Sequence, residues 1–209
     1  MQIAIVGAGN VGKALATGWI AAGHQVTFGV RDPQSPPQEG PSGAGYASVA
    51  DAAKAAAVVV LATPWPAVPD ALAVAGDLGG KVLIDCTNPL RVDAAGIALD
   101  VGFTTSGGEQ VATLAKGASV FKTLNQTGFD NMQHANGYTS LPAAMFVAGD
   151  DEAKKPVVLS LVSDLGFQAI DAGPLAIARL LEPMAMLWIH MALRRGMPPS
   201  RAFAMTDRV

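Results

Sequence analysis

An apolar strand, a glycine-rich turn and a helix open the chain, and this opening constrains the fold more than any other feature. The strand is expected over residues 2–6, and the turn reads Gly7-Ala8-Gly9-Asn10-Val11-Gly12. Apolar residues then recur at helical spacing up to Gly23, and a second strand follows over residues 25–30. Glycines in such a turn let backbone N–H groups approach a pyrophosphate, whose charge the helix dipole favours. The opening therefore predicts a dinucleotide-binding βαβ unit; the alternative is a glycine turn without a ligand.

The end of the second expected strand bears on which dinucleotide is bound. An acid at this place accepts hydrogen bonds from the ribose 2′-OH of NAD, whereas a nearby Arg accommodates the 2′-phosphate of NADP. The strand ends in Val30-Arg31-Asp32, where Val30 offers no acceptor and Arg31 is a planar cation suited to phosphate. Asp32 stands where an NAD-type acid is expected, but Asp before Pro33 also commonly begins a turn. We expect NADP, with a solvated surface role as the alternative for Arg31.

The composition favours a sheet that is buried on both faces. Half of the 209 residues are hydrophobic and only 15% are charged, which suits a parallel sheet covered by helices. A chain of this length forms one domain, or one domain with a small appendage.

Charge and cysteine content narrow the expected partners and location. The net charge is −3 and no basic run occurs, which argues against nucleic acid as a partner. Cys86 is the single cysteine, so an intrachain disulfide is excluded, and this fits a reducing cytoplasm. The N-terminus lacks the basic region of a secretion signal, and the longest uncharged stretches fall short of a bilayer span. We expect a cytoplasmic protein that engages neither nucleic acid nor membrane.

Strand and helix patterns alternate along the rest of the chain, and a weakly patterned loop is expected at residues 91–108. Strands are expected over residues 58–63, 81–85, 119–124, 144–148 and 167–171, and helices over residues 48–56, 64–75, 109–116, 156–165 and 175–193. This alternation predicts a Rossmann-type, doubly wound and mostly parallel α/β sheet, with a small C-terminal α/β extension ending in an apolar helix. We place the dinucleotide-binding core at residues 1–124 and a smaller part at 125–209, packed together as one compact unit.

Polar or proline-containing turns follow several of these strands. In a doubly wound sheet, ligands bind outside the carboxyl ends of the strands. The turns that should line this edge, besides the glycine turn, are Thr63-Pro64-Trp65, Asn88-Pro89 and residues 125–128. Trp65 suits either stacking on a cofactor or filling the space between helix and sheet, and the sequence does not choose between these roles.

Taken in order, the motifs resemble a known family along essentially the whole chain. GAGNVG after the first strand, GVR after the second, TPW after the third, NPL after the fourth, and GDDEAKK with DAGPL and ARLLEP near the end resemble the coenzyme F420-dependent NADP oxidoreductases. The oxidoreductase domain of the STEAP membrane ferric reductases is similar too. The resemblance implies a homodimer that binds NADP across the sheet edge and exchanges a hydride with a flavin-like cofactor, with F420, FMN and FAD as the candidates.

Carried over by this resemblance, the residues that contact the cofactor fall in the predicted turns. They are Gly7, Ala8, Gly9, Asn10 and Val11 at the pyrophosphate, Val30 and Arg31 at the 2′-phosphate, Thr63, Pro64, Trp65, Asn88 and Pro89 along the path to the nicotinamide, and Asn125, Thr127 and Gly128 beside it. Archaeal members resemble GSR followed by a lysine, whereas this chain has Val30 and, near the lysine position, Ser35. Deazaflavin-using members often resemble a His-Thr-Ile-Pro run at residues 125–128, so this chain leaves the acceptor open.

Hydride transfer between two heterocycles needs proximity and orientation more than an acid or a base, because the cofactors carry the reaction. We therefore expect no catalytic acid–base residue, and we interpret Asp85 as a turn residue. The three histidines show no metal-ligand spacing, and we expect no metal. Arg179 and Glu182 lie at helical spacing and suit a mutual ion pair, although Arg179 also suits an anionic ligand.

Two other functions remain open. The first is a module that senses NADP(H), or an electron-donor subunit that needs another protein for turnover. The second is a dehydrogenase or imine reductase of small metabolites. That reading predicts a longer helical substrate domain and a Lys or an acid near the nicotinamide, and the sequence offers neither clearly.

Overall fold

An eight-stranded sheet forms the centre of the protein. The structure is a computed structural model that describes residues 1–34, 40–94 and 96–208. The strands of the main sheet are β1 (Gln2–Val6), β2 (Gln25–Val30), β3 (Gly45–Ser48), β4 (Val58–Leu61), β5 (Val82–Asp85), β8 (Ser119–Lys122), β9 (Ala144–Gly149) and β10 (Gln168–Gly173). A separate hairpin pairs β6 (Leu90–Asp93) with β7 (Gly96–Leu99) in antiparallel register.

The strand order confirms the predicted fold class. Along the sheet the order is β10-β9-β8-β5-β4-β1-β2-β3, and all neighbours are parallel except β8 and β9. Its run β3-β2-β1-β4-β5-β8 is the Rossmann order, in which the chain reverses direction of winding between β1 and β4. The crevice outside the carboxyl ends of these two strands is thus the expected ligand position. The sheet continues from β8 to β9 across the division that we placed after residue 124, and the division itself stays a prediction.

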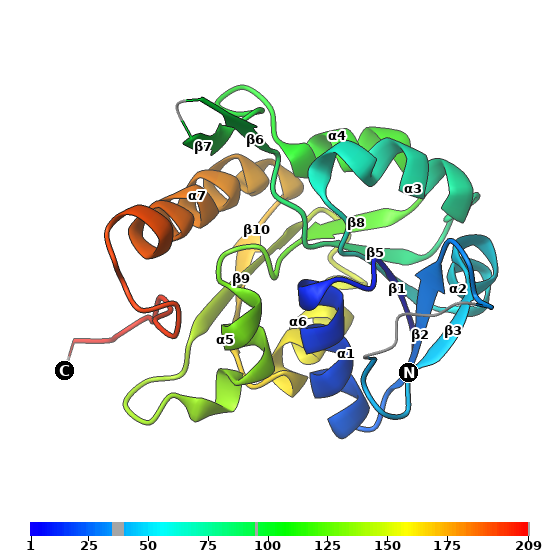
Figure 1. The fold of residues 1–209 in the computed structure, drawn as a ribbon, viewed down its shortest axis with the longest axis horizontal. Helices are drawn as coiled ribbons and strands as arrows, with labels where there is room; N and C mark the ends of the chain where they lie inside the picture. The colour runs from blue at the N-terminus through cyan, green and yellow to red at the C-terminus, as the bar shows by residue number, and fades with distance from the viewer. Residues whose placement is uncertain (35–39, 95, 209) are drawn as a thin grey trace.

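Helices cover both faces of the sheet, as Figure 1 shows. They are α1 (Asn10–Ala21), α2 (Val49–Ala55), α3 (Val68–Ala75), α4 (Gly107–Leu114), α5 (Phe129–Gln133), α6 (Lys155–Asp164) and α7 (Ala178–Arg194), with short 3-10 turns η1 (Trp65–Ala67), η2 (Ala135–Gly137) and η3 (Leu175–Ile177). One core cluster packs α1, α5 and α6 on the sheet, and the other packs α2, α3 and α4 on the opposite face. Trp19 of α1 is fully buried in the first cluster and donates its indole N–H to the Leu161 carbonyl of α6 at 2.8 Å.

Local signals place several element boundaries as predicted. Ser48 caps α2, because its hydroxyl accepts a hydrogen bond from the Asp51 N–H. Gly23 follows α1 with a φ of 85°, and Gly166 follows α6 with a φ of 98°, a conformation that glycine adopts without a steric penalty.

Four elements differ from the sequence prediction, namely β6, β7, β3 and α5. The expected loop over residues 91–108 is wrong in its first part, because β6 and β7 form a hairpin there. The short edge strand β3 and the five-residue helix α5 were also not predicted. They are only four or five residues long, and the alternation of apolar and polar residues in β6 (LRVD) covers four positions, which is too short for a reliable periodic pattern. The predicted Pro/Gly/Ser-rich loop includes residues 35–39, among them Ser35, which lie outside the described residues.

The apolar C-terminal helix packs on the body with only part of its surface. Leu181, Ala185 and Trp188 of α7 are buried, whereas Leu180, Leu187 and Leu193 are exposed. By length and hydropathy the stretch Leu175–Arg194 would suffice to cross a membrane. A third of its 18-residue apolar segment is buried inside the protein. Core helices of soluble proteins meet the same criterion. The expectation that the protein does not engage a membrane therefore stays a prediction.

Candidate functional site

Two cavities adjoin at the carboxyl edge of the sheet, on either side of the turn that follows β4. The first has a volume of about 560 Å³, and the second has a volume of about 750 Å³. Thr63 and Pro64 line both cavities. The predicted site residues Gly7, Ala8, Val30 and Arg31 line the first cavity, and Gly9, Asn10, Val11, Trp65 and Asn88 line the second. We call the first the Arg31 cavity and the second the Trp65 cavity.

The glycine turn lies between the two cavities, and its three glycines have different reasons to lack a side chain. A Cβ on Gly7 would lie 2.5 Å from the Ala62 carbonyl oxygen, and a Cβ on Gly12 would lie 2.1 Å from the Gly7 carbonyl oxygen. Nothing lies within 4 Å of a Cβ on Gly9, which is exposed and precedes α1 without a side-chain cap. Gly7 and Gly12 therefore permit the turn to pack, whereas Gly9 leaves open space before the uncapped N-terminus of α1.

Thr63 presents an unused hydroxyl where the cavities join. Its Oγ1 is buried and has no hydrogen-bond partner among the described residues. Buried polar groups are normally paired, so an unpaired hydroxyl in a cavity wall is suited to a ligand. Together with the open space at Gly9 and the uncapped N–H groups of α1, this hydroxyl fits the phosphates of a dinucleotide.

The outer end of the Arg31 cavity carries the two residues that bear on the choice of nucleotide. Arg31 is exposed there and forms no ion pair within the described part of the chain. The Asp32 carboxylate accepts a hydrogen bond from the Gln34 N–H at 2.9 Å. This contact confirms that Asp32 begins a turn, and it leaves Arg31 as the charged group free to meet an anion.

The Trp65 cavity has mainly apolar walls. Trp65 itself also packs against the core cluster on the α3 side, so the structure shows the filling role and leaves room for stacking. The β6–β7 hairpin closes one side with Leu90 and Val92. Cys86 lies at the edge of this cavity, where burial, together with the negative charge of Asp85, raises the pKa of its thiol well above the usual range. The contribution of the hairpin to this cavity was not predicted, because residues 91–108 were expected to form a loop.

The turn at residues 125–128 uses its polar groups inside the protein. Asn125 and Asn88 are bonded to one another, with the Asn88 amide donating to the Asn125 carbonyl and the Asn125 amide donating to the Asn88 side chain. The Thr127 hydroxyl accepts from the Asn131 amide, and Gly128 lies against Trp188, where a Cβ would come within 2.7 Å of the indole ring. Pro89, Asn125, Thr127 and Gly128 do not line either described cavity, and their contact with a cofactor stays a prediction.

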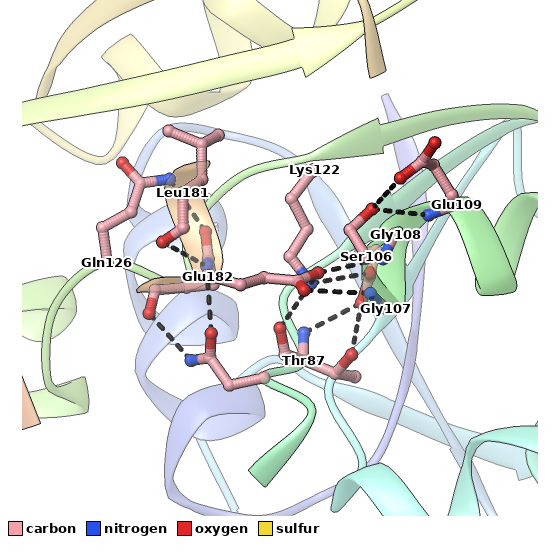
Figure 2. A network of polar contacts seen from close by, with 12 residues as sticks. Thr87, Ser106, Gly107, Gly108, Glu109, Lys122, Gln126, Leu181 and Glu182 are labelled. Atoms are coloured by element: carbon pink, nitrogen blue, oxygen red, sulfur yellow. Dashed lines mark hydrogen bonds and ion pairs between the residues drawn. The ribbon is translucent and has the colours of Figure 1, made fainter. Parts of the chain in front are cut away.

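A buried ion network adjoins the Trp65 cavity through Thr87, which lines that cavity. Figure 2 shows the polar contacts around Lys122, Thr87 and Glu182. Lys122 is fully buried, and its ammonium lies 2.9 Å from an Asp85 carboxylate oxygen, 3.0 Å from a Glu182 carboxylate oxygen and 2.6 Å from the Thr87 carbonyl oxygen. Burial alone would lower the pKa of Lys122, but the charges and hydrogen bonds of Asp85 and Glu182 outweigh burial and raise it. The lysine is therefore charged at neutral pH.

The sequence pattern does not predict this network, and the suggested ion pair between Arg179 and Glu182 is wrong. Arg179 does not pair with Glu182; it forms two hydrogen bonds to Glu109 at 2.6 and 2.8 Å, and these lower the pKa of Glu109. Glu182 instead accepts from the Gly107 and Gly108 N–H groups at 2.9 Å each. A charged residue inside an apolar run, as in SVFKTL and LLEPM, is the signal that would have pointed to a buried pair.

A Rossmann-ordered sheet, a glycine turn at its switch point and an uncapped helix N-terminus together define a dinucleotide-binding protein. The model of the family described as NADP oxidoreductase, coenzyme F420-dependent, matches residues 2–89. A crystal structure from Arthrobacter sp. FB24, provisionally named an F420-dependent NADP reductase, is 32% identical with a TM-score of 0.90, and the match covers 99% of this chain and 100% of that one. The chain belongs to the family of coenzyme F420-dependent NADP oxidoreductases.

Other similar proteins agree on the fold. A Sinorhizobium meliloti protein of hypothetical function is 28% identical with a TM-score of 0.74, over 85% of this chain and 88% of that one. A reductive aminase from Aspergillus terreus in complex with NADPH and ethyl levulinate shares the fold at 22% identity and a TM-score of 0.66, over 93% of this chain and 62% of that one. Rat metalloreductase STEAP3 is 25% identical over 185 residues. The match covers 88% of this chain but only 36% of STEAP3, so the chain spans about a third of that relative's length.

The contrast between Gly9 and Gly12 predicts that stability and ligand binding separate in two alanine variants. Gly12→Ala places a Cβ against the Gly7 carbonyl, so we expect its free energy of unfolding to fall by about 1–3 kcal/mol. Gly9→Ala meets open space, so its stability should stay within about 0.5 kcal/mol of the unmutated protein while its affinity for a dinucleotide falls. Urea unfolding and dinucleotide titration measure the two effects. Unchanged affinity in Gly9→Ala would contradict a phosphate site at this turn.

Proposed function

We propose that the protein is an NADP-dependent oxidoreductase that exchanges a hydride between NADP(H) and a flavin-like or deazaflavin acceptor. One observation carries the proposal: two mainly apolar cavities share Thr63 and Pro64, and Arg31, which forms no ion pair among the described residues, lines one of them. Arg91 in the other cavity is instead paired with Asp93. The Arg31 cavity suits the adenosine and its 2′-phosphate. The Trp65 cavity suits the nicotinamide with room for a second planar ring. Family membership supports the same assignment.

The protein's part in this reaction is binding and orientation. The N–H groups at the start of α1 and the Thr63 hydroxyl would hold the pyrophosphate, and Arg31 would hold the 2′-phosphate. Trp65 and the hairpin residues Leu90 and Val92 would flank the rings and exclude water from between them. The nicotinamide, when bound, supplies the hydride. Because no proton needs to move on these side chains, a cavity with mainly apolar walls suffices for the chemistry.

Arg31 and Asp32 should shift the choice between NADPH and NADH in opposite directions. Arg31→Ala removes the cation that would meet the 2′-phosphate, so we expect the NADPH preference to fall by about tenfold or more, to near equality. Asp32→Asn keeps the acceptor oxygen of the turn but removes a negative charge, so the NADPH preference should rise. Titration of each protein with both nucleotides gives the ratio of dissociation constants. Equal affinities in the unmutated protein would refute the NADP assignment.

The acceptor is tested by offering several classes separately. We expect the protein to oxidise NADPH with at least one of F420, FMN and FAD. The reaction is monitored by the absorbance of the reduced nicotinamide. Trp65→Ala removes one wall of the Trp65 cavity, so it should lower this rate by about tenfold or more, whereas Arg31→Ala should act mainly through the apparent affinity for NADPH. A ferric chelate serves as the fourth acceptor. Tight NADPH binding without turnover on any acceptor would favour a sensor or an electron-donor subunit, and turnover only on imines or carbonyls would favour a metabolite reductase.

We further propose that the protein is a homodimer and that the exposed face of α7 forms its interface. Leu180 and Leu187, two turns apart on α7, lie on this face with 65% and 52% exposure. Large exposed apolar faces mark interaction sites, and the family resemblance favours a second copy of this chain. Light scattering should give twice the chain mass, and Leu187→Lys should halve it while leaving the fold unchanged by circular dichroism. A monomer that binds lipid vesicles through α7 would contradict the proposal.

A further inference from the structure

The buried network of Lys122, Asp85 and Glu182 lies at the meeting point of four elements. Lys122 comes from the end of β8, and Asp85 is its register partner at the end of β5. Glu182 comes from the first turns of α7, and its carboxylate accepts from the first two N–H groups of α4. The three side chains are at most 1% exposed. Asp85 and Lys122 lie outside the motifs that resemble the family, and Glu182 is the Glu of ARLLEP.

Every polar atom of the network is used. The Lys122 ammonium has three acceptors, namely Asp85, Glu182 and the Thr87 carbonyl. The other Asp85 oxygen accepts from both the N–H and the hydroxyl of Thr87, at 2.9 and 2.7 Å. Two carboxylates and one ammonium leave one excess negative charge, which faces the positive end of the α4 dipole through Glu182. The network is therefore complete without a ligand, and it is not itself a binding site.

What the network holds is one wall of the Trp65 cavity. The backbone N–H, the backbone carbonyl and the hydroxyl of Thr87 are all bonded to Asp85 or Lys122. Cys86, Thr87 and Asn88 line this cavity, and they do not line the Arg31 cavity. Asp85 and Lys122 together therefore hold Thr87, the middle residue of this wall segment.

The same network reaches the aromatic wall of the cavity through α4. A Cβ on Gly107 would lie 3.1 Å from Glu182, 3.2 Å from Trp65 and 3.3 Å from Pro89. Gly107 is therefore packed between the network, the aromatic wall of the cavity and the segment after β5. A shift of Glu182 would move the N-terminus of α4, against which Trp65 rests.

We propose that Lys122, Asp85 and Glu182 are positioning residues that set the spacing of the nicotinamide half of the site and leave the adenosine half unaffected. This inference rests on the proposed function, because it assigns the Trp65 cavity to the nicotinamide. The three side chains would act by holding residues 86–88 and Trp65 in fixed positions. A well-placed cavity wall matters for hydride transfer, because the rate depends steeply on the distance and angle between the two rings.

The test compares a whole ligand with half of it. In Lys122→Met we expect NADPH to bind about tenfold or more weakly, whereas 2′,5′-ADP, which occupies only the adenosine half, should bind within about twofold of the unmutated protein. Lys155→Met is the control for loss of a buried ammonium, although its two partner carboxylates are 73% and 44% exposed rather than buried. Lys155 is also buried and is held by two carboxylates, Glu152 at 2.6 Å and Asp171 at 3.1 Å, but it lies on α6, whose helix covers the opposite face of the sheet. Both variants should lower the melting temperature, and only Lys122→Met should separate the two ligands.

Hydrogen–deuterium exchange supplies a readout that needs no ligand. We expect faster exchange in Lys122→Met over residues 86–90 and 106–109, with β1 and β2 unchanged, and no such change in Lys155→Met. Unchanged exchange over residues 86–90, or an equal loss of NADPH and 2′,5′-ADP affinity, would overturn the inference. If the unmutated protein binds neither ligand, the proposed function fails, and the exchange pattern alone decides whether the network holds the wall.

A milder pair of variants covers the case in which Lys122→Met does not fold. Thr87→Val removes only the hydroxyl bond to Asp85 and creates no unpaired buried charge. It should speed exchange over residues 86–90 and weaken NADPH by about threefold without affecting 2′,5′-ADP. Thr87→Ser keeps the hydroxyl and should restore both properties. Identical behaviour of the two Thr87 variants would contradict the positioning role.

Discussion

The buried ammonium of Lys122 joins the carboxyl ends of β5 and β8 to α7, at the part of the sheet edge that lies away from the glycine turn. Removing the charge of Lys122 would leave Asp85 and Glu182 facing each other without water, and breaking such a buried pair typically costs about 3–5 kcal/mol. Hydrophobic residues in the same space would satisfy the fold equally well, since buried ion pairs add little net stability over apolar packing. The free-energy cost of burying these charges is therefore explained by the groups that the charges hold in place, rather than by added stability. They fix Thr87, the start of α4 and, through Gly107, the place of Trp65.

The network also explains why the C-terminal third belongs to the site. Glu182 and Leu181 come from α7, after the division that the sequence suggests at residue 124. Glu182 bonds to the start of α4 in the nucleotide-binding core, and the Leu181 carbonyl accepts from the Asn125 amide, which also donates to Asn88. A Rossmann core alone would supply the glycine turn and the Arg31 cavity. The Trp65 cavity keeps its shape because α7 is packed behind it.

The sequence predicted those parts of the molecule that depend on local patterns. The strand and helix periodicities, the Gly23 stop and the Ser48 cap depend on residues close in sequence. The doubly wound fold class follows from the alternation of strands and helices. The hairpin β6–β7 escaped prediction because each strand has only four residues, so the alternation in LRVD is too short to distinguish a strand from a loop. The pairing of Lys122 with Asp85 and Glu182 escaped because each comes from a different element, and a single sequence contains no distance between them. Arg179 shows the same limit, since its partner Glu109 lies 70 residues away rather than one helical turn.

The protonated state of Cys86 has a consequence for any ring that enters the Trp65 cavity. A heterocycle able to accept a hydride is also open to attack by a sulfur nucleophile, and the thiolate is the nucleophilic form. Burial and the neighbouring carboxylate keep Cys86 as the neutral thiol. The sulfur can therefore contribute soft, polarisable contact to the wall without forming a covalent adduct. A cysteine so placed acts as a compact apolar side chain, and the ring that faces it can return to solution unmodified after each turnover.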